Sequence, residues 1–256
     1  MKGLLIALAV VLPGWSAAAH AKDIRVRVGA GAQVQPKFIG SDERQVGPLF
    51  HINVAKAGKE FKFAAPDDSF GIGVVSKNGF TFGPAANFQM RRKESDVGAP
   101  VGNVGRTIEA GAFAQYAPND SFRVRGEILK GLNGHDGLLG SIGADKIWRD
   151  GDRYLFSIGP RLLFSDSRYQ RAYFGVSPAA SLASGLPTYR PGGGVHGVAV
   201  TSTGSYELNG SWGLFGFARY ERLVGDAAKS PIIRQLGSRN QLSAGVGVNY
   251  IFNFHL

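Results

Sequence analysis

The segment from Gln241 to Leu256 constrains the fold most, because its side chains alternate between apolar and small or polar types. Successive side chains of a strand point to opposite faces, so the segment predicts a strand with one wholly apolar face. Soluble strands usually run about five or six residues, whereas a tilted strand that crosses a bilayer needs roughly nine to eleven. A long, alternating, aromatic-rich strand at the C-terminus is typical of the closing strand of an outer-membrane barrel. Its apolar residues are Leu242, Ala244, Val246, Val248, Tyr250, Phe252, Phe254 and Leu256.

The N-terminal segment has the layout of a secretory signal peptide. A short basic start precedes an apolar run from Leu4 to Leu12, and Ala19-His20-Ala21 fits the small-x-small pattern of a cleavage site. The apolar run is shorter than the roughly 20 residues of a membrane helix, which disfavours the alternative of an uncleaved anchor. We therefore expect a signal peptide at residues 1–21 and a mature chain at residues 22–256.

Composition and charge exclude some functions and disfavour others. The chain holds no cysteine, which excludes disulfides, thiolate chemistry and zinc–thiolate sites. A formal net charge of +10 would suit a nucleic-acid-binding protein, but a glycine-rich, alternating chain with an export signal argues against nucleic acid as a partner. Attraction to anionic cell-wall polymers, or to the phosphates of outer-membrane lipid and lipopolysaccharide, fits the charge better.

The same alternation recurs between turn signals along the mature chain. Apolar residues occupy every second position of segments such as Ile24–Val34, Phe80–Met90 and Tyr154–Phe164. Residues that suit tight hairpins separate these runs, as at Asn133-Gly134 and Asn209-Gly210, and no segment carries a sustained helical period. Longer irregular segments are predicted as loops at Pro36–Arg44, Arg91–Gly105, Ala183–Gly194 and Val224–Arg239.

These patterns predict an all-β protein: a single transmembrane antiparallel up-and-down β-barrel of about twelve strands, with ten or fourteen as alternatives. The count depends on Lys59–Ser76, where Pro66-Asp67-Asp68 could be a kink within one strand or a hairpin between two. Bacterial barrels favour even counts, which place both termini on the periplasmic side. We therefore expect an integral protein of the cell outer membrane.

If the apolar face meets lipid, the opposite face lines the lumen of the barrel. One interpretation is an anion-attracting pore. The other is an interior filled by Arg–Glu pairs with little free channel, which the modest room inside about twelve strands favours. Lys130, Lys146 and Arg222 fall on the lipid face near strand ends, where their charges can reach the head groups. The charges predicted to line the lumen are Arg25, Arg27, Glu109, Arg123, Arg125, Glu127, Arg161, Arg219 and Glu221.

Residues with catalytic or ligand chemistry are few. The chain has neither the His-x-Ser pair of some barrel lipid deacylases nor a Gly-x-Ser-x-Gly elbow. Gly134-His135-Asp136-Gly137 could hold a metal, but one His–Asp pair between glycines is a weak metal signal, so a structural turn is predicted. His51 is expected in the lumen, His196 in a loop, and Asp67-Asp68 in a turn. We therefore expect no enzyme, no catalytic residue, no cofactor and no metal.

Short motifs across nearly the whole mature chain resemble the MipA/OmpV family of outer-membrane proteins. Each motif is weak alone, but their order and spacing make the resemblance specific. Phe38 departs from the tyrosine expected there, and Leu256 from the expected terminal aromatic residue. The motifs are Phe38-Ile39-Gly40-Ser41-Asp42, Phe82-Gly83-Pro84, Gly134-His135-Asp136-Gly137, Gly159-Pro160-Arg161, Tyr173-Phe174-Gly175-Val176, Ser184-Gly185-Leu186-Pro187-x-Tyr189, Arg222-Leu223-x-Gly225-Asp226-Ala227, Ser230-Pro231-Ile232 and Gly237-Ser238-x-Asn240-Gln241.

The resemblance implies an outer-membrane barrel without known catalysis. The family's namesake is regarded as a scaffold that links a membrane-bound lytic transglycosylase to a peptidoglycan synthase, and other members are discussed as porin-like proteins or adhesins. We therefore expect a scaffold for peptidoglycan-remodelling enzymes, with a murein transglycosylase and a peptidoglycan synthase as partners. The alternatives are a porin-like channel for small solutes or ions, a surface adhesin and, behind these, a lipid-modifying barrel enzyme.

Overall fold

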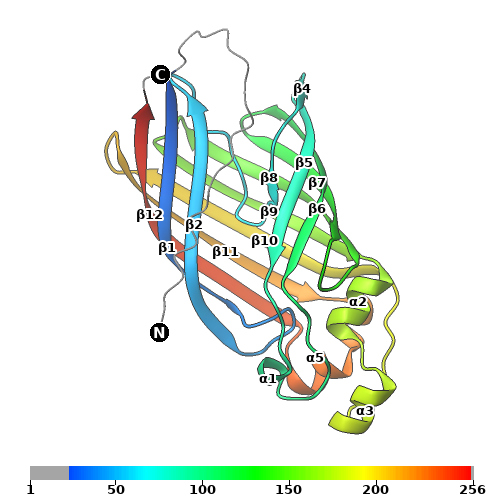
Figure 1. Cartoon of the computed structure of the whole chain (residues 1–256). Helices are drawn as coiled ribbons and strands as arrows, with labels where there is room; N and C mark the ends of the chain where they lie inside the picture. The colour runs from blue at the N-terminus through cyan, green and yellow to red at the C-terminus, as the bar shows by residue number, and fades with distance from the viewer. Residues whose placement is uncertain (1–22, 255–256) are drawn as a thin grey trace.

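The computed structural model describes residues 23–254, which form one strongly curled antiparallel sheet with a concave interior (Figure 1). The signal peptide predicted at residues 1–21 lies outside the described residues. The described part of the chain contains twelve strands, two of them very short. The strands are β1 Ile24–Pro36, β2 Arg44–Lys56, β3 Phe70–Gly71, β4 Val75–Lys77, β5 Phe80–Gln89, β6 Thr107–Asn119, β7 Phe122–Gly131, β8 Leu138–Asp150, β9 Tyr154–Ser165, β10 Gly194–Glu207, β11 Trp212–Leu223 and β12 Asn240–Phe254.

The strand order brings the two ends of the described chain together. It runs β2-β1-β12-β11-β10-β9-β8-β7-β6-β5-β3, and β4 also pairs with β5. β1 pairs with β12 from Ile24–Phe254 to Val34–Ala244, so the strand predicted to close the sheet does lie against the first strand. Within residues 23–254 no ladder joins β2 to β3, which are the two edges of the sheet.

The outward face of the long strands is apolar and exposed. Phe50 on β2 is 76% exposed and Val246 on β12 is 66% exposed, and large apolar residues on the other long strands are exposed in the same way. A continuous apolar surface of this extent is stable against lipid and not against water. The prediction of an all-β, antiparallel, barrel-type sheet of about twelve strands is confirmed.

Five short helices within residues 23–254 gather at one end of the sheet, which we call the loop end (Figure 1). Side-chain periodicity did not predict these helices, because they are four to eight residues long, too short for a helical period. Asp166 and Ser177 cap two of them by accepting hydrogen bonds from the N–H groups of Tyr169 and Ala180. None of the described helices is long and apolar enough to cross a membrane. The helices are α1 Glu94–Val97, α2 Ser167–Phe174, α3 Pro178–Ser184, α4 Gly225–Lys229 and α5 Pro231–Leu236.

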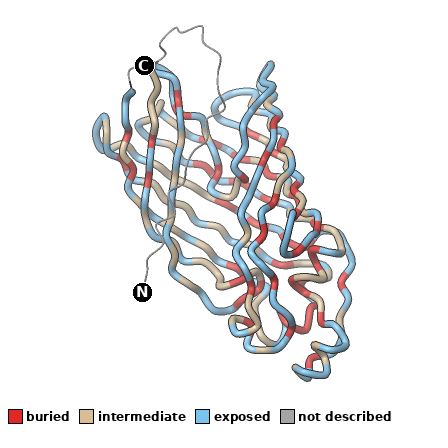
Figure 2. Tube along the Cα trace, viewed as in Figure 1, coloured by how far each residue is buried: buried red, intermediate tan, exposed pale blue. Residues whose placement is uncertain are grey.

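The main hydrophobic core of the described chain lies at the loop end and not between the strands (Figure 2). Phe174, Ile232 and Ile233 are almost completely buried among residues of the connecting segments. Burial of each such side chain contributes about 1.5–3 kcal/mol, so the connections form a packed cap over this end of the sheet. The opposite end, which we call the terminal end, carries Ile24, Phe254 and mostly short turns.

Residues 57–69, between β2 and β3, form no strand and run into the concave side of the sheet (Figure 1). We call them the inward segment. The sequence predicted a kinked strand or a hairpin over Lys59–Ser76, and that prediction is wrong, because only β3 and β4 in this stretch are paired. The inward segment leaves the sheet because its aromatic and acidic side chains find partners in the interior.

Candidate functional site

The nine charged residues predicted to face the lumen lie along the concave side, where they bind one another and the inward segment. Arg27, Arg123, Arg125, Arg161 and Glu109 are buried. The other four are partly buried: Arg25, Glu127, Arg219 and Glu221. They form three groups: a central cluster, a group around Phe61, and the pair of Glu109 with His135.

Asp145 of β8 holds the central cluster together from the wall of the sheet. One of its carboxylate oxygens accepts hydrogen bonds from Nε and Nη2 of Arg123 on β7, at 3.0 and 2.6 Å. The other accepts from Nη2 of Arg161 on β9, at 2.7 Å. Asp145 therefore links three adjacent strands through two guanidinium groups, an arrangement that charge-assisted hydrogen bonds stabilise strongly.

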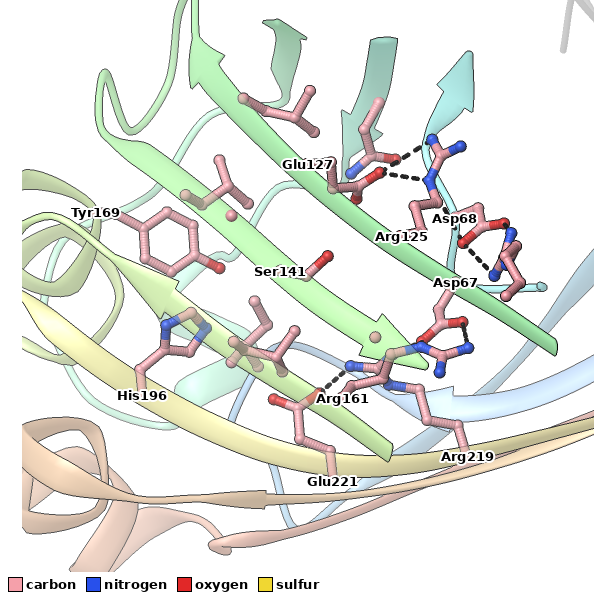
Figure 3. A pocket seen from close by; sticks show the side chains of 18 residues that line it. Asp67, Asp68, Arg125, Glu127, Ser141, Arg161, Tyr169, His196, Arg219 and Glu221 are labelled. Carbon is pink, nitrogen blue, oxygen red and sulfur yellow. Dashed lines mark hydrogen bonds and ion pairs between the residues drawn. The ribbon is translucent and has the colours of Figure 1, made fainter. Parts of the chain in front are cut away.

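Asp67 and Asp68 of the inward segment complete the cluster from the other side (Figure 3). Asp67 accepts hydrogen bonds from Nε of Arg161 at 3.0 Å and from the hydroxyl of Thr201 at 2.9 Å, and also from Nη1 of Arg219. Asp68 accepts from both Nη atoms of Arg123. Burial raises the pKa of Asp67, but the adjacent Arg219 and Arg161 outweigh it and hold that pKa below its ordinary value.

The sequence around Pro160 explains why Arg161 reaches this cluster. The ladder between β8 and β9 is interrupted between the pairs Gly143–Arg161 and Lys146–Ile158. Pro160 has no N–H to donate, and Nη1 of Arg161 instead donates to the carbonyl oxygen of Ala144, at 3.3 Å. A Cβ on Gly159 would lie 1.7 Å from that same oxygen, so only glycine permits this close approach of the strands.

Phe61 anchors the inward segment nearer the terminal end. Its ring lies between the guanidinium groups of Arg25 and Arg27, 4.8 and 4.1 Å from the ring centroid. Its N–H donates to Asp152 at 3.0 Å, and Asp152 also accepts from Arg25 at 2.8 Å. Phe63 packs under Arg123 in the same way, at 4.6 Å. Aromatic rings and carboxylates of one segment thus contact arginines of several strands.

The Gly134–Gly137 turn, between β7 and β8, inserts His135 under the cap. The N–H of Gly137 donates to Nδ1 of His135 at 3.0 Å, so Nε2 carries the proton and donates to Glu109 at 2.9 Å. A Cβ on Gly134 would lie 2.1 Å from the hydroxyl oxygen of Thr107, which explains the glycine there. Over residues 23–254 no group of three His, Cys, Asp or Glu residues could hold a metal ion.

The other two histidines of the described sheet lie in strands. The prediction that His196 lies in a loop is wrong: it belongs to β10, is buried, and its Nδ1 lies 3.0 Å from Oγ of Ser165. No carboxylate of the described residues hydrogen-bonds to His196, so the pair lacks the orienting third group of a catalytic triad. His51 is partly buried on β2, 5.4 Å from the ring of Phe215.

The cluster lines a partly open cavity of about 170 Å³, with Tyr169 and His196 on the side away from the inward segment (Figure 3). This volume admits water molecules and is below the roughly 300–1,000 Å³ of pockets that bind drug-sized ligands. The sequence anticipated arginines matched by glutamates, but most partners are aspartates: Asp67, Asp68, Asp145 and Asp152. Asp145 shares its strand parity with the inward residues of β8, a signal that the sequence did contain. Asp67 and Asp68 carried no such signal, because they lie outside any strand.

The comparison with protein families matches residues 28–252 to the family described as MltA-interacting protein MipA. The chain belongs to the MipA family. This membership and the exposed apolar face of the strands make it an outer-membrane barrel protein. No curated protein sequence matches it.

Solved outer-membrane proteins resemble this MipA-family chain only weakly. OprG from Pseudomonas aeruginosa is 12% identical, with a TM-score of 0.30 and coverage of 91% of this chain and 96% of OprG. The monoaromatic hydrocarbon channel CymD is 10% identical, with a TM-score of 0.38 and coverage of 92% and 90%. Neisserial surface protein A is 13% identical, with a TM-score of 0.26 and coverage of 90% and 97%. Similarity at this level assigns no activity to the chain.

Several MipA-like motifs of this chain converge at the loop end. Gln241 accepts a hydrogen bond from the N–H of Gly40 at 3.0 Å and donates to the carbonyl oxygens of Ser41 and Ser238 at 3.1 and 2.7 Å. Motif residues also supply much of the hydrophobic core of the cap, namely Phe38, Tyr173, Phe174, Val176, Leu186, Leu223, Ala227 and Ile232. The motifs are therefore residues that build the cap and join the first connection to the last strand.

Proposed function

We propose that this protein is a non-enzymatic scaffold of the outer membrane that binds a lytic transglycosylase and a murein synthase. The observation that carries the proposal is the family match over residues 28–252, whose description names an interaction with MltA. The interior supports a non-catalytic role, because its charged groups are engaged in mutual ion pairs. Export through a cleaved signal peptide at residues 1–21 is part of the same proposal.

A partner in the periplasm needs a surface at the terminal end, since short turns of bacterial barrels face the periplasm. A cavity of about 440 Å³ lies there, between the inward segment, the turn from β4 to β5 and the turn from β6 to β7. Phe63 and Phe80 supply aromatic surface to it, and Lys62 and Lys77 supply exposed charge. The inward segment thus provides a concave surface that short turns alone would lack, and this supports docking of a partner segment.

Site-specific cross-linking tests the scaffold role. A photo-reactive amino acid at Lys77, beside the cavity, is expected to cross-link a transglycosylase or a synthase in intact cells. The matched control is the same group at Leu182, which is 91% exposed on α3 at the loop end and should capture neither enzyme. Absence of both enzymes from the Lys77 products, with normal assembly of the barrel, would contradict the scaffold role.

A second function is favoured by one observation: the segment that fills the interior is anchored by side chains and not by a sheet ladder. We propose as the alternative a porin-like channel for small solutes or ions that the inward segment closes. Wild-type protein in planar bilayers should then show rare conductance steps, and a variant without the anchoring carboxylates should show frequent ones. If neither the wild-type protein nor the variant produces conductance steps, the channel function is contradicted.

A further inference from the structure

Arg92, which follows β5 at the loop end, carries a buried charge that forms no direct ion pair within the described chain, although Glu94 attracts it from farther away. Arg92 is 1% exposed. Its Nη1 donates to the carbonyl oxygen of Tyr173 at 2.6 Å and its Nη2 to that of Gly102 at 3.0 Å, while its Nε has no hydrogen-bond partner. A buried charge is costly unless it is paired, so its retention here calls for a compensating anion.

Arg92 lies in the wall of a cavity of about 250 Å³ that is separate from the cross-linking surface at the terminal end. The cavity lies between the first connection, the end of β5 and the start of β12. Gln35, Gln45 and Gln89 line it with partly exposed amides, and Arg91 lines it with an exposed guanidinium. Its partly exposed rim leaves the cavity accessible from the loop end.

The charges around this cavity leave a positive excess. Among its lining residues Lys37 is paired with Glu43, and Arg219 is paired with Glu221 and Asp67. Arg91 has no ionic or hydrogen-bonding partner in the part of the chain that the structure describes. Arg91 therefore presents a free guanidinium group to the cavity, and the buried charge of Arg92 lies in the cavity wall.

The cavity also adjoins the central cluster. Ile39, Arg219 and Glu221 line both this cavity and the interior cavity, so the two are neighbours along the axis of the sheet. Their charge states differ, however, because the central cluster is neutralised by its own carboxylates and this cavity is not. The excess of positive charge is therefore confined to the cavity at the loop end.

We propose that this cavity binds a small oxyanion group, a carboxylate or a phosphate, at Arg91, with the buried charge of Arg92 behind it in the cavity wall. Guanidinium groups suit such ligands because their planar donors match the oxygens of carboxylates and phosphates. The free amides of Gln35 and Gln89 add neutral donors for further oxygens or hydroxyls of the ligand. Phosphate could come from a free solute or from a lipid head group in the outer leaflet, which present the same chemistry. The proposal is independent of partner docking at the terminal end.

Isothermal titration of the full chain with inorganic phosphate in non-ionic detergent tests the site. The wild-type protein is expected to bind phosphate. The substitution Arg91→Gln changes an exposed residue and should leave folding intact, and it is expected to weaken phosphate binding about tenfold. Arg92→Met should abolish binding, while Arg92→Lys keeps the charge and should retain part of it. If Arg92→Met does not fold, the Arg91→Gln result decides. The matched control is Arg153→Gln, the same charge change at an exposed turn of the terminal end.

A second arm separates the two sources of phosphate. The protein is reconstituted in phosphatidylcholine vesicles with and without lipid A, and thermal unfolding is followed for wild type and Arg91→Gln. Stabilisation of wild type alone by lipid A identifies a head group as the ligand, whereas stabilisation by inorganic phosphate alone identifies a free solute. Both results support the site. Binding that is absent in both arms, or that Arg153→Gln weakens as much as Arg91→Gln does, overturns the proposal.

Discussion

Removal of the two carboxylates that anchor the inward segment should release it from the interior. The perturbation is the double variant Asp67→Asn, Asp68→Asn, which keeps the size of both side chains and removes their charge. In the native protein Asp67 binds Arg161 and Arg219, and Asp68 binds Arg123. The variant leaves these arginines with fewer anionic partners and the segment with neutral, weaker acceptors.

The magnitude follows from the burial of these pairs. Removal of one partner of a buried ion pair costs about 3–5 kcal/mol, and each asparagine retains one acceptor, so we take about 3 kcal/mol as the minimum for the two substitutions together. At about 1.4 kcal/mol for each factor of ten, the fraction of molecules with a released segment should rise at least roughly a hundredfold. The strands keep their ladders, so the sheet itself should remain folded.

The assay uses the absence of cysteine from the chain. Ala65→Cys places the only thiol of the protein in the inward segment, at a position that is 6% exposed in the native structure. The rate of its modification by a membrane-impermeant maleimide reports the released fraction. The control carries Ala65→Cys with Asp150→Asn, which removes a carboxylate from an exposed pair at the terminal end.

A clear result would refute this reasoning. If the thiol reacts at the same rate with and without Asp67 and Asp68, the segment is not held by these ion pairs. The contacts of Phe61 with Arg25 and Arg27 would then be the main anchor. A tenfold or smaller rise would mean that water or neighbouring carboxylates replace most of the lost interaction.

Three further predictions concern pH, backbone packing and the cap. The pKa of Asp67 is lower in the folded protein than in the unfolded chain, so the contribution of Asp67 to anchoring is fully present above about pH 4 and is lost as the pH falls through the lowered value. Pepsin should then cleave residues 57–69 faster at pH 2 than at pH 4, and this increase should be larger in the wild-type protein than in Asp67→Asn. Gly159→Ala places a Cβ against the carbonyl oxygen of Ala144 and should cost about 1–3 kcal/mol in urea unfolding, whereas Gly47→Ala meets no atom within 4 Å and should cost far less. His135→Ala leaves Glu109 without its buried partner and should lower the stability of the cap by about 1–3 kcal/mol. Faster amide hydrogen exchange in α2 would show this loss, and unchanged exchange would contradict a role for the pair in the cap.

The alternation of side chains determined much of the architecture before any tertiary information. A period of two identifies strands and assigns each side chain to one of two faces, and that parity is a local property of the backbone. The length of the C-terminal strand and its apolar face therefore predicted a membrane-facing sheet, and the parity of Arg123 and Arg161 predicted that their side chains share a face. The five short helices escaped prediction because a helix of one or two turns gives no periodic signal and depends on tertiary packing for its stability.

The partners of the arginines could not be predicted, because they depend on how the whole sheet folds. Asp67 and Arg219 are 152 residues apart in the chain, and no local rule relates a turn between strands to a residue on a distant strand. Their meeting depends on how far the sheet curls and on where residues 57–69 leave it. The same holds for Arg92, whose burial follows from the packing of the cap. The direction of each strand side chain could be predicted from the sequence, because it depends only on adjacent peptide units. The partners of the buried charges depend on the curvature of the whole sheet, so they were fixed only when the chain had folded.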